Sequence, residues 1–182
     1  SSKEKKNMVL TAFRVQNDCR RRGNGPVNRN SICSILSKKN INNANMGNNF
    51  YWRLLDTKFV ISPEGNGIDC HRHWEALYFG AIPIVERNEE MEKKLIGLPV
   101  LYTTDYSEIN ETYLKNIYDK MINTEYDFSR LMIQCYPKKS MELMIRRSNH
   151  WNGRRGKSLF YKVCLDSVIP NFYKKVSLIT IT

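Results

Sequence analysis

A glycine-rich turn followed by an arginine and a glutamate is the part of this sequence best suited to chemistry. Gly65 and Gly67 come directly after an apolar segment, and Arg72 and Glu75 follow in the next predicted helix. Glycine lets a backbone pass close to a bulky anion and adopt φ values that other residues resist. The start of a helix adds unpaired N–H groups and a partial positive charge. Together, the turn and the helix predict a binding site for a diphosphate.

The two charged residues after the turn suit two different parts of a nucleotide. Arg72 is predicted one turn into the helix, where its guanidinium can pair with phosphate oxygens. Glu75 lies three residues further on, on a neighbouring part of the same helix face. A carboxylate there can accept two hydroxyl hydrogen bonds, as the diol of a ribose would offer. In open α/β sheets ligands gather at the carboxyl ends of strands, which is where this turn is predicted.

The spacing of the glycines excludes two common nucleotide-binding motifs. Gly65 and Gly67 are followed by Cys70 where the dinucleotide fingerprint has its third glycine. No Gly-Lys-Ser/Thr follows them, as it does in a P-loop. The sequence therefore argues against a dehydrogenase and against a P-loop NTPase.

Apolar segments alternate with amphipathic segments along the chain. Continuous apolar runs predict strands of the kind buried on both faces of a parallel sheet, at 8–13, 58–63, 82–85 and 99–102. Helical spacing predicts helices at 31–39, 50–56, 69–79, 89–95, 107–121 and 127–148, and polar stretches predict loops at 20–30 and 40–49. This order predicts an α/β fold: a Rossmann-like parallel sheet with helices on both faces. The whole of 1–182 is interpreted as a single domain, with a core at about 8–148 and a helical tail at about 149–182.

Caps and burial are predicted for several of these helices. The pair Asn30–Ser31 is expected to cap the first helix, and Asp69 is expected to cap the helix that carries Arg72. In the short helix at 50–56, Trp52 and Leu55 are expected to point into the core.

The cysteines and histidines do not form a metal-binding pattern. Five cysteines are scattered without a CxxC pair, which also excludes a disulfide scaffold. His71 and His73 point apart on a helix, and the set Cys70, His71, His73 and His150 lacks the paired clusters of a zinc site. No metal is therefore predicted. Reduced thiols favour the cytoplasm as the compartment, and an upstream targeting segment stays open.

The charge pattern suggests an anionic partner and leaves its class open. The net charge is +11, distributed as +8 over residues 1–50, −5 over 51–136 and +8 over 137–182. Two basic ends are compatible with a nucleic-acid-binding module as well as with a site for a phosphorylated small molecule. Residues 14–30, which contain several arginines, include no aromatic side chain for base stacking, so nucleic acid is the less favoured partner. No apolar run is long enough for a transmembrane helix.

A resemblance to a known family rests on the segment from Ser62 to Val85. It reads S-P-x-G-N-G-I-D-x-x-R-x-W-E-A-L-x-x-G-x-I-P-I-V. This pattern resembles the donor-site signature of exostosin-type glycosyltransferases, and related glycosyltransferases of large DNA viruses carry it too. The match is dense over 58–85 and looser over about 8–136. It implies the C-terminal, donor-binding half of a GT-B glycosyltransferase, which transfers a sugar from a nucleotide-diphosphate sugar, with a UDP-sugar favoured.

The resemblance also implies roles for particular residues. Arg72 would hold the diphosphate, with Arg21 as a further anion partner, and Glu75 would bind the ribose. The rest of the expected donor site is Glu64, Gly65, Asn66, Gly67, Asp69 and His71. GT-B enzymes generally work without a metal, so no cofactor is expected beyond the nucleotide sugar. The acceptor, a glycan or a protein, would bind a second domain on sequence outside this chain, and a sugar-nucleotide-binding domain without turnover remains an alternative. No catalytic residue is assigned.

Overall fold

The computed structural model describes residues 4–23, 25, 27–44, 49–132, 135, 137–140 and 142. Backbone contacts divide the chain into two compact units, Ser1–Leu131 and Met132–Thr182. In the second unit, residues 138–140 and 142 are helical, and the tail predicted at 149–182 lies outside the described residues. None of the helices in the described part of the chain has the length and apolar character needed to cross a membrane.

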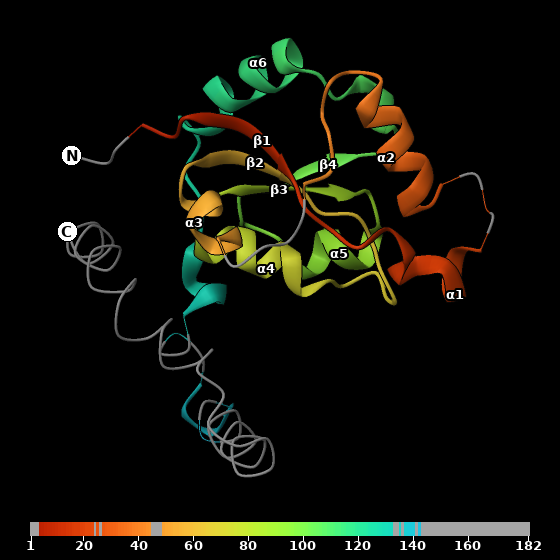
Figure 1. Cartoon of the computed structure of the whole chain (residues 1–182). Helices are drawn as coiled ribbons and strands as arrows, with labels where there is room; N and C mark the ends of the chain where they lie inside the picture. The colour runs from red at the N-terminus through yellow and green to blue at the C-terminus, as the bar shows by residue number, and fades with distance from the viewer. Residues whose placement is uncertain are drawn as a thin grey trace. The chain divides into compact units, whose positions relative to one another are not determined.

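The first unit is built on a four-stranded parallel sheet (Figure 1). Its strands lie side by side in the order of the sequence: β1 (Asn7–Thr11), β2 (Thr57–Ile61), β3 (Ile82–Glu86) and β4 (Leu101–Thr103). All three neighbouring pairs are parallel, so the carboxyl ends of the strands meet at one edge. The predicted Rossmann-like α/β fold is confirmed.

Helices cover both faces of this sheet (Figure 1). On one face lie α2 (Arg29–Ser37) and α6 (Glu111–Met121). On the other face lie α3 (Phe50–Leu55), α4 (His71–Tyr78) and α5 (Glu89–Lys94). Side chains alternate along a strand. On β2, for example, Phe59 packs toward α6 while Val60 packs toward α3 and α4.

The predicted loop at 20–30 is wrong at its start. A 3-10 helix at Val15–Asp18 runs into the short helix α1 (Cys19–Arg22), in which Arg21 and Arg22 have the carboxylate partners described below. The prediction of which residues of α3 are buried is also wrong. Phe50 and Leu54 are buried, whereas Trp52 is 72% exposed and Leu55 37% exposed.

The predicted helix at 107–121 begins later than expected. Residues Tyr106–Glu108 form a 3-10 turn, and Asn110 caps α6 by accepting a hydrogen bond from Tyr113 N at 2.9 Å. The continuous helix predicted at 127–148 is also wrong. Residues Phe128–Leu131 form a 3-10 helix, and positions 132 and 137 are not helical. Among 127–148, residues 133, 134, 136, 141 and 143–148 lie outside the described part.

A capping box starts α2 two residues earlier than predicted. Asn28 is the N-cap: its side chain accepts from Ser31 N at 2.8 Å, and Ser31 Oγ accepts from Asn28 N at 3.0 Å. The Asn28 amide also donates to Gly25 O at 3.1 Å, so it joins the loop to the helix. Asn30, one of the two predicted caps, lies exposed inside the helix.

We expect Asn28→Ala to lower the free energy of unfolding by about 1 kcal/mol, because the first N–H groups of α2 lose their acceptor. Asn30→Ala is the matched control and should change stability by less than about 0.5 kcal/mol, since its side chain is exposed. Urea denaturation of both variants measures the difference. Equal losses in the two variants would contradict the assignment of the cap.

Candidate functional site

The glycine turn lies between β2 and α4, at the edge where the strands end. It is closed by a hydrogen bond from Gly65 N to Gly67 O at 3.0 Å. Neither glycine has a positive φ, so the prediction that the turn needs unusual φ values is wrong. A Cβ on Gly65 would lie 2.9 Å from Arg29 Nη2, whereas a Cβ on Gly67 would meet none of the described residues within 4 Å. Gly65 is therefore required by the close approach of an arginine.

Arg29, at the start of α2, is the residue that holds this edge together. It is only 6% exposed. Its guanidinium donates to Glu64 O at 2.8 Å and Pro63 O at 3.0 Å, beyond β2, and to Arg14 O at 2.9 Å, beyond β1. It also lies 5.3 Å from the centroid of the Phe13 ring. Sequence reasoning missed Arg29, because nothing near position 29 indicates partners so far away in the chain.

Two of the three arginines of α1, Arg21 and Arg22, reach the same edge and are paired with carboxylates. Arg21 forms an ion pair with Glu64, and its Nε donates to Gly65 O at 3.2 Å. Arg22 bridges the side chains of Glu64, at 2.9 Å, and Glu86, at 3.1 Å. The structure therefore brings together three residues of the expected donor site, Arg21, Glu64 and Gly65. It also shows that the charges of Arg21 and Arg22 are already paired with acidic side chains.

Arg72 and Glu75 form a second group, on the side of α4 that faces α3. Arg72 is 5% exposed, and its Nη1 lies 3.7 Å from Glu75 Oε2. Its guanidinium stands 4.2 Å from the centroid of the Phe50 ring. Burial lowers the pKa of Arg72, and Glu75 opposes that shift.

The two carboxylate oxygens of Glu75 have different surroundings. Oε1 accepts a hydrogen bond from the Tyr51 hydroxyl at 3.0 Å. Oε2 is buried beside Arg72 and accepts no hydrogen bond from the described residues. Because a buried acceptor normally has a donor, an oxygen in this state points to a ligand or to an exchangeable partner.

Asp69 belongs to a third group, on the side of the turn next to α5. Its prediction as the cap of α4 is wrong: the N-cap is Cys70, and no side chain caps the helix. Asp69 instead accepts from Trp74 Nε1 at 2.9 Å and pairs with Lys94. Desolvation would raise the pKa of Asp69, but the bonds from Lys94 and Trp74 outweigh it and lower the pKa.

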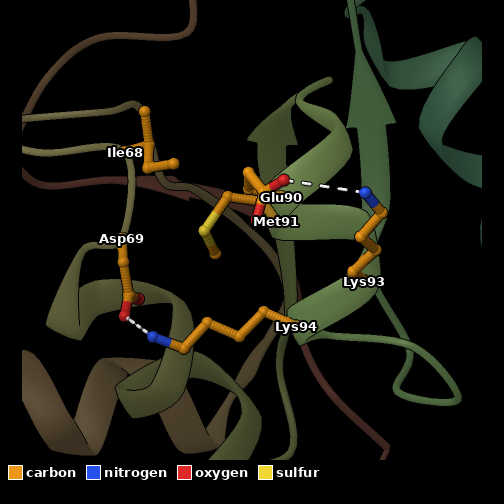
Figure 2. Close-up of a pocket in the computed structure, with 6 residues that line it drawn as sticks. All are labelled: Ile68, Asp69, Glu90, Met91, Lys93 and Lys94. Carbon is orange, nitrogen blue, oxygen red and sulfur yellow. Dashed lines mark hydrogen bonds and ion pairs between the residues drawn. The ribbon is translucent and has the colours of Figure 1, made fainter.

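A shallow pocket of about 450 Å³ lies between this turn and α5 (Figure 2). The ion pairs of Asp69 with Lys94 and of Glu90 with Lys93 lie along its wall. The lining residues are Ile68, Asp69, Glu90, Met91, Lys93 and Lys94. Each of these charged side chains already has a partner of opposite charge, so the pocket offers no surplus of positive charge to an anion.

His73 is a further residue that sequence reasoning did not place in the site. It is fully buried, with Nδ1 2.6 Å from Ser62 Oγ and Nε2 3.2 Å from Ile68 O. Burial lowers its pKa. In the part of the chain that the structure describes, no three His, Cys, Asp or Glu side chains gather closely enough to hold a metal ion.

The predicted site residues thus fall into separate groups around one turn. Arg21, Glu64 and Gly65 lie together, Arg72 and Glu75 lie together against α3, and Asp69 faces α5. Asn66, Gly67 and His71 are exposed. No protein-family model matches this chain, and no curated protein matches it either. Its function is therefore argued from these residues.

Proposed function

We propose that this chain is the donor-binding domain of a glycosyltransferase, and that it binds a nucleotide-diphosphate sugar at the start of α4. The observation that carries the proposal is the pair of buried Arg72 and partly buried Glu75, whose Oε2 accepts no hydrogen bond from the residues that the structure describes. A guanidinium beside an unused carboxylate oxygen offers a partner for phosphate and an acceptor for a hydroxyl in one place. A UDP-sugar is the favoured donor, on the family resemblance of the turn and α4.

Helix α3 holds both side chains in place for this role. The Phe50 ring supports the Arg72 guanidinium, and Tyr51 fixes one oxygen of Glu75. Glu75 therefore presents Oε2 as its main acceptor, and we propose that one ribose hydroxyl binds there. The sequence had suggested that the carboxylate accepts two hydroxyl hydrogen bonds.

A diphosphate at the carboxyl ends of the strands would have to compete with the ion pairs already formed there. Of the side chains in these ion pairs, that of Arg21 is the most exposed: 34% of it is accessible, against 8% for Glu64. We propose that Arg21 exchanges part of its contact with Glu64 for a phosphate oxygen, while Arg29 stays on its backbone carbonyls. The uncapped N-terminus of α4 adds the positive end of a helix dipole.

The proposed reaction moves a sugar from the nucleotide to an acceptor hydroxyl. Guanidinium groups and the helix dipole would stabilise the diphosphate as it leaves, the task that a metal performs in other transferases. The acceptor, a glycan or a protein, is proposed to bind a second domain. Turnover is therefore expected only when such a domain is supplied, and donor binding without turnover in its presence would favour the non-catalytic alternative.

Calorimetric titration of the chain with UDP, GDP and CDP tests the proposal. We expect saturable one-site binding of one of them, with UDP favoured. Arg72→Ala is expected to weaken that binding by at least about tenfold, since a charge-assisted hydrogen bond is lost. Arg72→Lys keeps the charge without the planar guanidinium, so its affinity should lie between those of the wild type and Arg72→Ala.

Arg53→Ala serves as the matched control, because Arg53 is an exposed arginine on the neighbouring helix α3. It should leave the affinity unchanged. If Arg72→Ala also leaves it unchanged, the site is wrongly assigned. A single-stranded oligonucleotide is titrated at two salt concentrations. If only the oligonucleotide binds, and its affinity falls steeply with salt, the chain is a nucleic-acid-binding module.

A further inference from the structure

His73 connects three parts of the proposed site through a single buried side chain. Its ring lies between Ser62, at the end of β2, and Ile68, in the glycine turn. His73 itself is the neighbour of Arg72 on α4. The imidazole therefore ties the strand end, the turn and the helix to one another.

The partners of His73 determine which tautomer the neutral ring adopts. Ile68 O can only accept a hydrogen bond, so Nε2 carries the hydrogen at 3.2 Å. Nδ1 is then the acceptor, and the Ser62 hydroxyl donates to it at 2.6 Å. Both ring nitrogens are satisfied in this neutral tautomer. Burial lowers the pKa of His73 and also favours the neutral form.

We propose that His73 is a positioning residue for the donor site, and that its neutral form holds the glycine turn in the shape that receives the diphosphate. This inference rests on the proposed function and adds a pH dependence to it. The start of the turn is held by the bond between Gly65 and Gly67 and by the donors Arg29 and Arg21, whereas its next two residues, Asn66 and Gly67, are exposed. The bond to Ile68 O fixes the far end of the turn to α4.

Protonation of His73 would disturb this arrangement. A hydrogen on Nδ1 would meet the hydrogen of the Ser62 hydroxyl, which must then turn away inside a fully buried environment. Burial lowers the pKa of His73, and Arg29 lowers it further, whereas Asp69 and Glu64 raise it.

The sign of the pH effect follows from the lowered pKa. In the unfolded chain His73 takes up a proton as the pH falls through about 6.5, whereas the folded protein does so only at lower pH. The unfolded state therefore binds more protons in that window, and stability is lost as the pH falls below about 6.5. At lower pH, where the folded protein is protonated too, the turn itself should loosen.

Two variants separate the two bonds of the ring. His73→Gln keeps an N–H donor near the position of Nε2, and so preserves the bond to Ile68 O. His73→Asn keeps an acceptor near the position of Nδ1, and so preserves only the contact with Ser62. Hydrogen exchange of the segment 63–69, followed by mass spectrometry without any ligand, reports on the turn alone. Thermal melts establish that each variant is folded.

At neutral pH we expect exchange of this segment to be about tenfold faster in His73→Asn, and close to wild type in His73→Gln, because one buried hydrogen bond is lost only in the former. On acidification below about pH 6.5, the exchange rate corrected for the slower intrinsic exchange of amides in acid should rise in the wild-type segment. In the Gln variant the corrected rate should not rise, since this variant cannot titrate at position 73. His71→Gln, which alters the exposed neighbouring histidine, should keep the acid response of the wild type.

Calorimetry with the nucleoside diphosphate that binds best completes the test. Its affinity should fall more steeply with acid in the wild type than in His73→Gln, where the terminal phosphate of the ligand still titrates but position 73 does not. The inference is overturned if the Asn and Gln variants exchange equally, or if the corrected exchange rate still rises with acid in His73→Gln. If the turn behaves as expected but no nucleoside diphosphate binds at any pH, the positioning of the turn stands and the proposed function fails.

Discussion

Arg29→Ala should lower the free energy of unfolding by about 3–5 kcal/mol, the largest effect we expect from a single substitution in this chain. The loss has two sources. Three carbonyl oxygens lose their hydrogen-bond donor: those of Pro63 and Glu64, which are buried, and that of Arg14, which is partly buried. The removed side chain also leaves a cavity between Phe13 and the turn.

Urea denaturation measures this loss, and two further variants sharpen the test. Arg20→Ala removes an exposed arginine from α1 and should cost less than about 0.5 kcal/mol. Arg29→Lys keeps one charged group in place of the guanidinium and can satisfy fewer of the carbonyls, so its loss should be smaller than that of Arg29→Ala. A loss below about 1 kcal/mol in Arg29→Ala would show that the carbonyls find other donors.

Gly65→Ala is expected to destabilise the fold by about 1–3 kcal/mol, because the new methyl group overpacks a closely filled site. Its Cβ would lie 2.9 Å from Arg29 Nη2 and 3.4 Å from Cys70 Sγ. An arginine on the surface could swing aside, but Arg29 is fixed by its carbonyl acceptors. The methyl group therefore displaces either the guanidinium from Pro63 O or the turn from α2.

Gly67→Ala is the matched control for this substitution. Gly67 lies in the same turn and has no positive φ, and in the described part of the chain nothing lies within 4 Å of the new Cβ. Its stability should stay within about 0.5 kcal/mol of wild type. Thermal and urea unfolding of the two variants provide the comparison. Should Gly67→Ala prove the more damaging of the two, the close approach of Arg29 is not the reason for the glycine at position 65.

The fold could be predicted from the sequence because its strands carry a strong local signal. Segments such as Phe59-Val60-Ile61 and Ile82-Pro83-Ile84-Val85 are apolar on both faces, and this identifies strands of a covered parallel sheet. The helices were found by their spacing, although their ends moved by a few residues. Asn28 and Asn30 show why: both are good capping residues, and only the course of the preceding loop decides between them.

The site was predicted less well, because its contacts join residues far apart in the chain. No local pattern reveals that Arg29 reaches Glu64, or that Arg22 reaches Glu86. Likewise, the burial of His73 depends on a serine at the end of β2. The exposure of Trp52 was also missed. The apolar pattern of a helix of only six residues is too short to show which side packs on the sheet.

The sheet order has a consequence for the time course of folding. Residues of β2 and β3, such as Phe59 and Ile82, pair across a shorter stretch of chain than Asn7 of β1 and Thr57 of β2 do. Closing a longer loop costs more entropy, so we expect β2, β3 and β4 to assemble in the transition state before β1 joins them. The contacts of Arg29, which link the segments after β1 and β2, would then form late. Most of the stability lost in Arg29→Ala should therefore appear as a faster unfolding rate in stopped-flow experiments, with the refolding rate nearly unchanged.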